Sequence, residues 1–271
     1  MTAFELLSRA WTTTNSLLCV GLDTDPAKLP QSLIDDKDSV FLFNKAIVNA
    51  THEFVCCYKL QFAFYGAAGR EHDLERTIQY IKNSYPNIPL ILDSKRSDIG
   101  NTCEMYAKEA FVRYGAHMVT VNPYLGSDCV LPFLAFQDNA ALILCKTSNS
   151  GARDFQDLDC GGKKLYLRIA EHAAGHWNAR KNLGLVVGAT YPAELAEIRA
   201  AIGDDIPILL PGIGAQGGDV GAAVKNGRNR HGNGLMINSS RGIIYKSSGD
   251  DFADAARAEA RRLSDEINQY R

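Results

Sequence analysis

A short stretch of mixed charges follows an apolar run in the first half of the chain. The segment DSKRSDIGNT (93–102) carries Asp93, Lys95, Arg96 and Asp98 within six positions, directly after the apolar residues IPLIL. Residues two apart on a strand point to the same side, so a strand ending here would direct Asp93 and Lys95 into one common space. A carboxylate and an ammonium held together suit acid–base and electrostatic catalysis.

The same charges also have a structural interpretation. Asp98 could cap a helix that begins near Ile99, with Lys95 and Arg96 as solvated partners. In a reaction site, by contrast, we expect Arg96 and Ser97 to act as little more than spacers. Whether the segment is a surface loop or a reaction site depends on which residues stand at the ends of the other strands.

Short apolar runs alternate with segments of helical periodicity along the rest of the chain. The helical segments include 39–55, 101–116 and 250–270. The eight apolar runs lie at 17–23, 55–63, 88–95, 117–123, 140–148, 183–190, 206–214 and 234–241. Because these runs are apolar on both faces, they indicate parallel strands covered by helices.

Eight strand–helix units in 271 residues predict an α/β protein, a (β/α)8 TIM barrel formed by a single domain over residues 1–271. A doubly wound open sheet is the structural alternative. The stretch 149–182 is longer than one crossover needs, and we expect a loop and an extra-long helix there.

Composition excludes several classes of protein. The net charge of −2 gives no general attraction to nucleic acid or to an anionic membrane, and no apolar run is long enough to span a bilayer. The amino-terminal residues lack the basic start and apolar core of a secretion signal, so we expect a cytoplasmic protein. Seven irregularly spaced cysteines favour reduced core residues over a disulfide framework or a zinc site.

Catalytic residues of a barrel lie at the carboxyl ends of its strands, where the following loops converge. Polar side chains stand at these ends in the first, second, third and fifth runs: Asp23, Lys59, Asp93 with Lys95, and Ser148. Such a gathering on one rim favours a reaction site over a structural interpretation of the charges.

The last two runs end in loops that suit a phosphate group. PGIGAQGG (211–218) and SSRG (239–242) follow the seventh and eighth runs. Glycines let backbone N–H groups approach an anion, and Arg241 adds a forked set of donors. Barrels frequently bind phosphate at these two loops, so the sequence predicts a phosphorylated ligand.

These segments together resemble the orotidine 5′-phosphate decarboxylase family. DSKRSDIGNT matches its signature D-x-K-x-x-D-I followed by Thr. LCVGLD, YKLQFAF, KTSNSG, PGIGAQGG and SSRG are similar to its other substrate-binding segments, in the same order, from about residue 17 to 245. The long loop after the fifth run resembles the longer bacterial subgroup. Ser94 and Ser150 depart from the usual Ala and Pro, which puts the rigidity of the Ser148 loop in doubt.

The resemblance implies a decarboxylase that converts orotidine 5′-monophosphate to UMP and CO2 in pyrimidine biosynthesis, without a cofactor or metal ion. Lys95 would be the proton donor, Asp93 would lie against the substrate carboxylate, and Lys59 would hold Asp93 and contact the ribose. Asp98, with Ile99 and Thr102, would reach into the neighbouring subunit's site in a homodimer. The remaining substrate-binding residues would be Asp23 for the ribose, Ser148 and Pro211 for the base, and Gln216, Ser240 and Arg241 in the two phosphate loops.

Two alternatives stay open. A related sugar-phosphate aldolase or decarboxylase of the same barrel superfamily shares D-x-K-x-x-D but uses Mg²⁺, and would be expected to place a metal-binding carboxylate where this chain has Lys59. The second alternative is a protein that binds a nucleotide phosphate without catalysing a reaction. The crowded charges argue against it, because bringing such groups together costs free energy that mere binding does not require.

Overall fold

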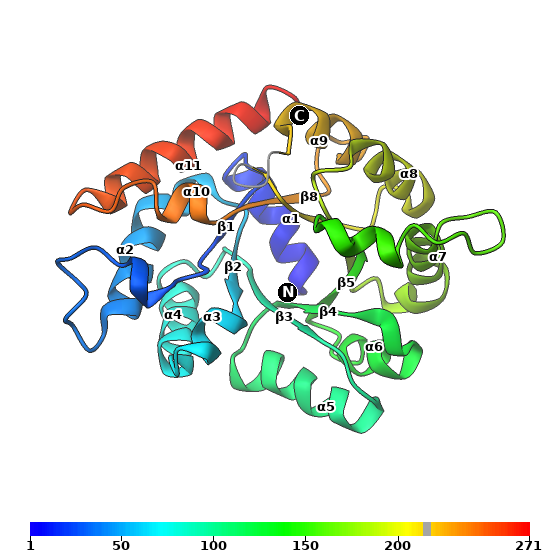
Figure 1. Ribbon diagram of the computed structural model, residues 1–271, viewed down its shortest axis with the longest axis horizontal. Coiled ribbons are helices and arrows are strands. Elements are labelled where there is room, and N and C mark those ends of the chain that lie inside the picture. Colours follow the sequence, from blue (N-terminus) through cyan, green and yellow to red (C-terminus); the bar gives the residue numbers. More distant parts are fainter. Residues whose placement is uncertain (214–217) are drawn as a thin grey trace.

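The chain forms a barrel of eight parallel strands. A computed structural model describes residues 1–213 and 218–271. The strands pair in chain order, and β8 closes the barrel on β1 (Figure 1). They are β1 (Leu18–Gly21), β2 (Cys57–Gln61), β3 (Leu90–Arg96), β4 (Met118–Val121), β5 (Ala140–Lys146), β6 (Leu183–Val187), β7 (Ile208–Pro211) and β8 (Leu235–Ser239).

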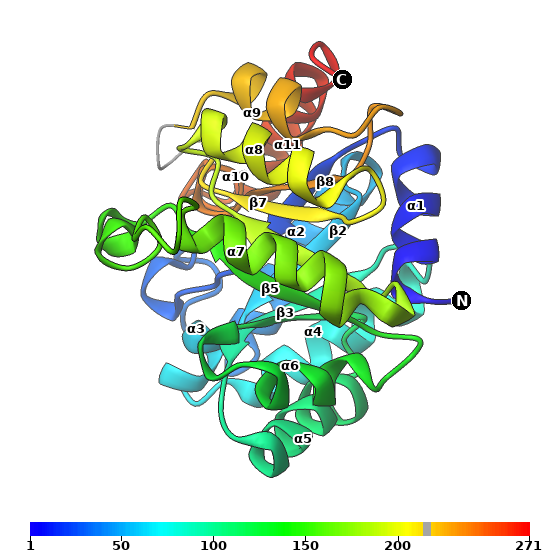
Figure 2. The same ribbon diagram turned by 90° about the vertical axis from the view of Figure 1, so that its right-hand side faces the viewer.

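Helices surround the strands, and one helix covers the amino end of the barrel (Figures 1 and 2). That helix is α1 (Ala3–Thr13), whose Trp11 indole donates a hydrogen bond of 2.9 Å to the Leu235 carbonyl. The other helices are α2 (Ser39–Thr51), α3 (Phe62–Ala67), α4 (Glu71–Ser84), α5 (Gly100–Lys108), α6 (Ser127–Leu134), α7 (Leu165–His172), α8 (Pro192–Ile202), α9 (Val220–Gly227), α10 (Arg241–Ile244) and α11 (Phe252–Asn268).

The predicted single-domain (β/α)8 TIM barrel is confirmed, and the open-sheet alternative is wrong because β1 and β8 are paired. Each strand lies inside its predicted apolar run, except that β3 continues one residue further, to Arg96. The strands are recognisable in the sequence because nearly every residue in them is buried, as a parallel sheet covered on both faces requires.

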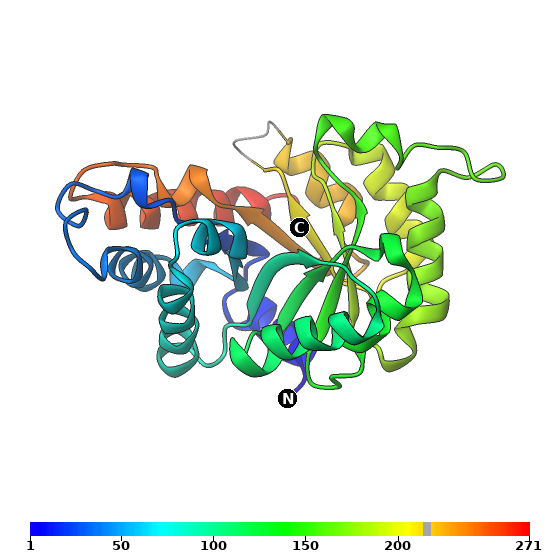
Figure 3. The ribbon, with the colours of Figure 1, turned by 60° about the horizontal axis from the view of Figure 1, so that its bottom comes forward.

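The segment between β5 and α7 is only partly as expected. It holds a 3-10 turn (Ser150–Asp154) and a bridge between Asp159 and Lys164, and it projects away from the barrel beyond α7 (green, Figure 3). The predicted loop is therefore present. The predicted extra-long helix is wrong: α7 and the π-helical turn after it end at Trp177, and together they are shorter than α11.

A buried arginine ties four segments together at the amino end of the barrel. Arg199 of α8 is only 8% exposed, and its guanidinium group donates to the carbonyl oxygens of Gly203, Ile206, Gly227 and Gly234 at 2.8–3.0 Å. These carbonyls belong to the ends of α8 and α9 and to the approaches to β7 and β8. The side chain thereby pairs carbonyl groups at the ends of these elements, and at Gly234 it adds to the hydrogen bond from the Ile208 N–H.

The strand that carries the charged cluster is irregular. β3 takes four residue steps from Leu92 to Arg96, while its partner β4 takes two from Val119 to Val121. Within this bulge Lys95 has a φ of +47°, in the left-handed region that residues other than glycine rarely adopt. The backbone at Lys95 is therefore set by its surroundings rather than by local preference.

Two further expectations concern the whole chain. In the part of the chain that the structure describes, none of the helices combines the length and apolar character needed to cross a membrane. All seven cysteines are free thiols, and six of them are buried.

Candidate active site

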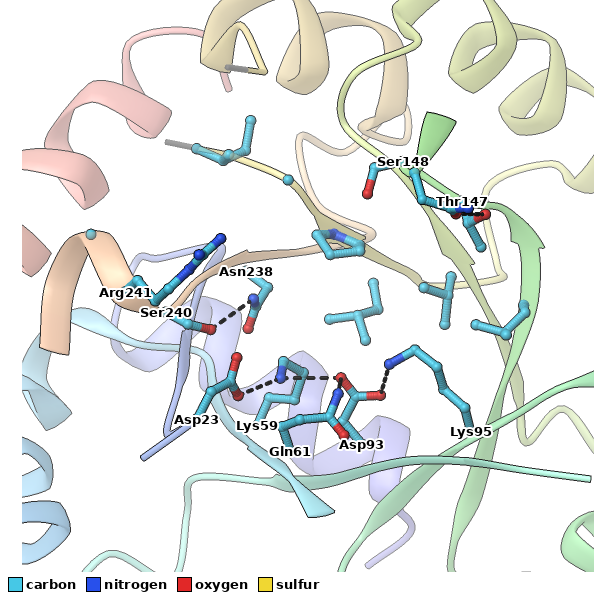
Figure 4. A pocket seen from close by; sticks show the side chains of 18 residues that line it. Asp23, Lys59, Gln61, Asp93, Lys95, Thr147, Ser148, Asn238, Ser240 and Arg241 are labelled. Carbon is cyan, nitrogen blue, oxygen red and sulfur yellow. Dashed lines mark hydrogen bonds and ion pairs between the residues drawn. The ribbon is translucent and has the colours of Figure 1, made fainter. Parts of the chain in front are cut away.

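A cavity of about 420 Å³ opens at the carboxyl end of the barrel, within the range of small-molecule sites. One wall carries a row of charged and amide side chains, the opposite wall is largely apolar, and the ends of β5 and β8 supply hydroxyl groups (Figure 4). The lining residues are Asp23, Lys59, Gln61, Asp93, Lys95, Leu144, Thr147, Ser148, Asn149, Val186, Leu209, Pro211, Gly212, Ile213, Asn238, Ser240, Arg241 and Gly242.

Lys59 lies between two carboxylates. Its ammonium is 2.8 Å from Asp23 Oδ1 and 3.1 Å from Asp93 Oδ2. The side chain is only 4% exposed, so the charge is held almost without water and depends on its two partners. The two carboxylates are thus bridged by an ammonium group that the end of β2 supplies.

Asp93 accepts from four donors, two on each oxygen. Oδ1 lies 2.7 Å from Lys95 Nζ and 2.8 Å from Thr120 Oγ1. Oδ2 lies 3.0 Å from Gln61 Nε2 and 3.1 Å from Lys59 Nζ. Every lone pair of this carboxylate has a partner, so its orientation is fixed and its ionised form is strongly favoured.

The charges keep both buried groups ionised. Burial alone would raise the pKa of Asp93, but Lys59 and Lys95 outweigh it and lower that pKa to about 2. Burial likewise opposes the charge on Lys59, yet Asp23 and Asp93 raise its pKa above the usual lysine value. Asp93 is therefore an anion and Lys59 a cation throughout the physiological pH range.

The apolar wall lies across the cavity from the charged row and suits a flat, uncharged ring. It is formed by Leu144, Val186, Leu209, Pro211 and Ile213.

Ser148 lies at the edge of the cavity, where the end of β5 approaches the end of β6. A Cβ added at Gly188 would come within 2.7–2.9 Å of Ser148 atoms, so a glycine is needed there for the loop to lie this close. The Gln156 side chain accepts from the Thr147 amide and donates to its hydroxyl, both at 2.8 Å, and so holds the residue before Ser148.

Ser240 and Arg241 lie at the other end of the charged row, beside Asp23 (Figure 4). β1 approaches them closely: a Cβ at Gly21 would lie 1.9 Å from Ser240 Oγ. Asn238 donates to the same hydroxyl at 3.3 Å. This end of the cavity offers a guanidinium and a hydroxyl group to a ligand.

Three predicted site residues are not among those that line the cavity. Asp98, Ile99 and Thr102 lie on the loop before α5 and on its first turn, and Ile99 is 59% exposed. Asp98 Oδ1 accepts from the Ile99 amide at 2.7 Å, while the helix has no side-chain cap, so Asp98 does not act as its N-cap. Gln216 lies outside the described residues.

Some residues around the site were missed by sequence reasoning. Gln61 lies two positions after Lys59 on β2, and this spacing alone could have indicated that both side chains face the cavity. Asn238 stands in the eighth apolar run and carried no distinguishing signal. Thr120 lies inside β4, and its contact with Asp93 depends on the bulge in the neighbouring strand.

The interpretation of Arg96 as a spacer is wrong. Its guanidinium makes hydrogen bonds of 2.8–3.0 Å with both oxygens of Glu109. It also lies between the rings of Phe62 and Tyr106, 4.6 and 4.5 Å from their centroids. Arg96 thus ties the end of β3 to the helices beside it.

A closed (β/α)8 barrel with alternating lysines and aspartates at its open end defines the class, a TIM-barrel enzyme. The model of the orotidine 5′-phosphate decarboxylase / HUMPS family matches residues 16–258. An orotidine 5′-phosphate decarboxylase of Cellvibrio japonicus (strain Ueda107) is 54% identical over 273 residues, which cover 100% of both chains.

Solved structures agree with the sequence relatives. The structure of Leishmania donovani OMP decarboxylase has a TM-score of 0.85 and 37% identity, and the match covers 100% of this chain and 98% of that one. Leishmania donovani UMP synthase has a TM-score of 0.87 and 39% identity, and this chain spans 56% of its length. The chain belongs to the orotidine 5′-phosphate decarboxylase / HUMPS family, and its full-length relatives place it among the carboxy-lyases.

Proposed function

We propose that this chain decarboxylates orotidine 5′-monophosphate to UMP and CO2 in pyrimidine biosynthesis, with residues 1–271 acting as one barrel domain. The observation that carries the proposal is the Asp93–Lys95 pair, at 2.7 Å, inside a cavity that also holds Lys59 and Arg241. Full-length relatives at 54% identity named for this activity support it.

Lys95 is the proposed proton donor. Breaking the bond between C6 and the carboxylate releases CO2 and leaves the electron pair on C6, where the ring delocalises it poorly. The Lys95 ammonium stabilises this negative charge as it develops and then transfers a proton to C6. Its side chain is 43% exposed and reaches into the cavity, as contact with a substrate requires.

Asp93 is the proposed neighbour of the substrate carboxylate. With a pKa of about 2 and four donors, it stays ionised and cannot turn away. Repulsion between two fixed carboxylates disfavours the bound substrate and disappears as CO2 leaves. The Lys59 ammonium holds Asp93 in place and lies near enough to Asp23 to share the ribose hydroxyls with it.

Binding energy from parts of the substrate far from C6 offsets this repulsion. Arg241, Ser240 and Gln216 are the proposed phosphate ligands, and Asp23 binds the ribose. Pro211 and the apolar wall receive the pyrimidine ring, with Ser148 hydrogen-bonding its edge.

We further propose a homodimer in which Asp98, Ile99 and Thr102 complete the partner's site. Two observations support this arrangement: none of the three lines the cavity of its own chain, and apolar side chains are exposed close by. Neighbouring elements carry Ile99, Met105, Tyr124, Leu125 and Leu131, each 46–86% exposed. An exposed apolar set of this kind is typical of a subunit interface.

The Mg²⁺-dependent alternative receives less support. Asp23 and Asp93, the acidic residues that line the cavity, have the Lys59 ammonium between them where a divalent ion would need their oxygens. Among the residues described, no three His, Cys, Asp or Glu side chains are grouped so as to hold a metal ion. The free, mostly buried thiols suit the cytoplasm that we propose as its location.

The deciding experiment is turnover of orotidine 5′-monophosphate by purified protein in the presence of EDTA, followed by the change in pyrimidine absorbance. We expect full activity with the chelator and none on a hexulose phosphate. Loss of turnover with EDTA, restored by Mg²⁺, would instead support the aldolase-type alternative.

A further inference from the structure

Thr120 lies on β4 directly opposite the bulge in β3. Val119 and Val121, on either side of it, pair with Leu92 and Arg96, so Thr120 faces the extra residues of β3. It is fully buried, and its strand is otherwise apolar, with the sequence MVTV. A hydroxyl group in this position needs hydrogen-bond partners to offset its burial.

The hydroxyl group of Thr120 has two partners, both in the charged segment. It accepts from the main-chain N–H of Lys95 at 2.9 Å and donates to Asp93 Oδ1 at 2.8 Å. In a regular ladder the Lys95 amide would donate to a carbonyl oxygen of the neighbouring strand. Here the side chain of Thr120 replaces that carbonyl, and the same oxygen then fixes the carboxylate two residues earlier.

We propose that Thr120 is a positioning residue for the reaction, one that holds the ammonium of Lys95 and the carboxylate of Asp93 in register with each other. The inference rests on the proposed decarboxylation for its kinetic consequence. The positioning of Lys95 and Asp93 by Thr120 follows from the bulge and its hydrogen bonds, whatever the reaction is. Thr120 itself does not line the cavity, so it acts through the two residues that do.

The left-handed backbone at Lys95 explains why such a device is needed. This conformation is unfavourable for lysine, and leaving it would change the direction in which the Lys95 side chain departs from the strand. The hydrogen bond from the Lys95 amide stabilises the unfavourable conformation. The second bond, from the hydroxyl to Asp93, makes that conformation and the carboxylate orientation depend on each other.

The test compares two replacements of Thr120 in the full-length protein. Thr120→Val keeps the shape but removes both hydrogen bonds, whereas Thr120→Ser keeps the hydroxyl group. We expect Val to lower kcat about tenfold to a hundredfold, the equivalent of one charge-assisted and one neutral hydrogen bond, with KM and the Ki of UMP within about twofold of wild type. We expect Ser to restore most of kcat.

A matched control separates positioning from general loss of stability. Thr51 is also fully buried, and its hydroxyl group lies 2.8 Å from both the Ile47 carbonyl and the Tyr58 hydroxyl, away from the cavity. Thr51→Val should lower Tm about as much as Thr120→Val and leave kcat unchanged. Equal kinetic effects of the two valine variants, or a serine variant as slow as Thr120→Val, would overturn the proposal.

A crystal structure of Thr120→Val tests the inference even if the wild-type protein does not act on orotidine 5′-monophosphate. We expect Lys95 to leave the left-handed region and its contact with Asp93 to be lost, while Thr120→Ser retains both. An unchanged Lys95 backbone in the valine variant would overturn the positioning role. An inactive wild type would overturn the proposed function alone.

Discussion

At the scale of single residues, the site depends on a lysine in an unfavourable backbone conformation. The φ of +47° at Lys95 costs about 1–2 kcal/mol for a residue with a Cβ atom. In this conformation the Lys95 ammonium lies 2.7 Å from Asp93 Oδ1. Part of the stability of the fold is thus given up for the geometry of the site.

The positive φ at Lys95 predicts that a glycine variant at this position is more stable than an alanine variant, the reverse of the usual order. Lys95→Ala and Lys95→Gly should both lose nearly all decarboxylase activity and remain folded. The glycine variant should be the more stable by about 1 kcal/mol in urea unfolding, because glycine adopts positive φ without steric cost.

The same pair of replacements at Glu104 provides the control. Glu104 is exposed on α5, where the order should reverse, with alanine favoured by about 1 kcal/mol. An alanine variant at Lys95 as stable as the glycine variant would contradict the role assigned to the backbone. Substantial turnover by either variant would contradict Lys95 as the proton donor.

At the scale of elements, side chains that bond to backbone groups hold neighbouring β–α units together. Arg199 does so between α8, α9 and the starts of β7 and β8. His117 does so between the starts of β3 and β4, where its Nδ1 accepts from the Leu90 amide at 3.1 Å. Both lie far along the strands from the cavity, so their effects should fall on stability rather than on chemistry.

Replacing Arg199 should destabilise the fold severely. Arg199→Met removes the side-chain donor of four carbonyl groups, of which Gly234 alone keeps the Ile208 N–H, and we expect a loss of about 3 kcal/mol or more in the free energy of unfolding. The kcat of the protein that remains folded should be unchanged. Arg261 is the matched control: it is 72% exposed on α11, and Arg261→Met should change stability by less than about 0.5 kcal/mol. Equal effects would contradict the assigned role of Arg199.

His117 predicts a specific dependence of stability on pH. Burial, helped by Lys82, lowers its pKa to about 4, against about 6.5 in the unfolded chain. Between these values the unfolded state binds more protons, so the free energy of unfolding should decrease as the pH falls from 6.5 to 4. Above pH 6.5 this contribution is fully present.

A comparison of urea unfolding at pH 7 and pH 5 tests this dependence. His117→Asn keeps an acceptor near the position of Nδ1 and cannot titrate. The wild type should lose about 1–2 kcal/mol more than this variant over the interval. Equal losses would show that His117 does not contribute.

At the scale of the whole molecule, the barrel was predictable because its signals are local. Each of the eight strands is a short apolar run, and the charges at strand ends mark the open end of the barrel. Thr120 and Arg199 could not be found in this way, because each works through a contact with a distant segment. The assignment of Asp98, Ile99 and Thr102 across a dimer interface stays a prediction, because a contact between two chains leaves no local signal in the sequence.

Mixing two inactive variants tests the composite site. If Asp98 serves the partner, dimers of one Asp98→Ala chain and one Lys95→Ala chain contain one intact site. After random subunit exchange we expect about a quarter of wild-type activity. Mixing Asp93→Ala with Lys95→Ala is the control and should restore nothing, because both residues belong to the same site. If the first mixture also stays inactive after exchange, Asp98 does not cross the interface.

The closed amino end of the barrel has a consequence for the order of product release. α1 packs across that end, and nearly all of the strand residues are buried. Under the proposed function, CO2 is released into the same cavity that still holds the nucleotide, and it leaves through the mouth of that cavity at the carboxyl end of the barrel. CO2 held beside the C6 carbanion can recombine with it before Lys95 transfers its proton, so incorporation of ¹³C-labelled CO2 into the substrate pool would measure this return.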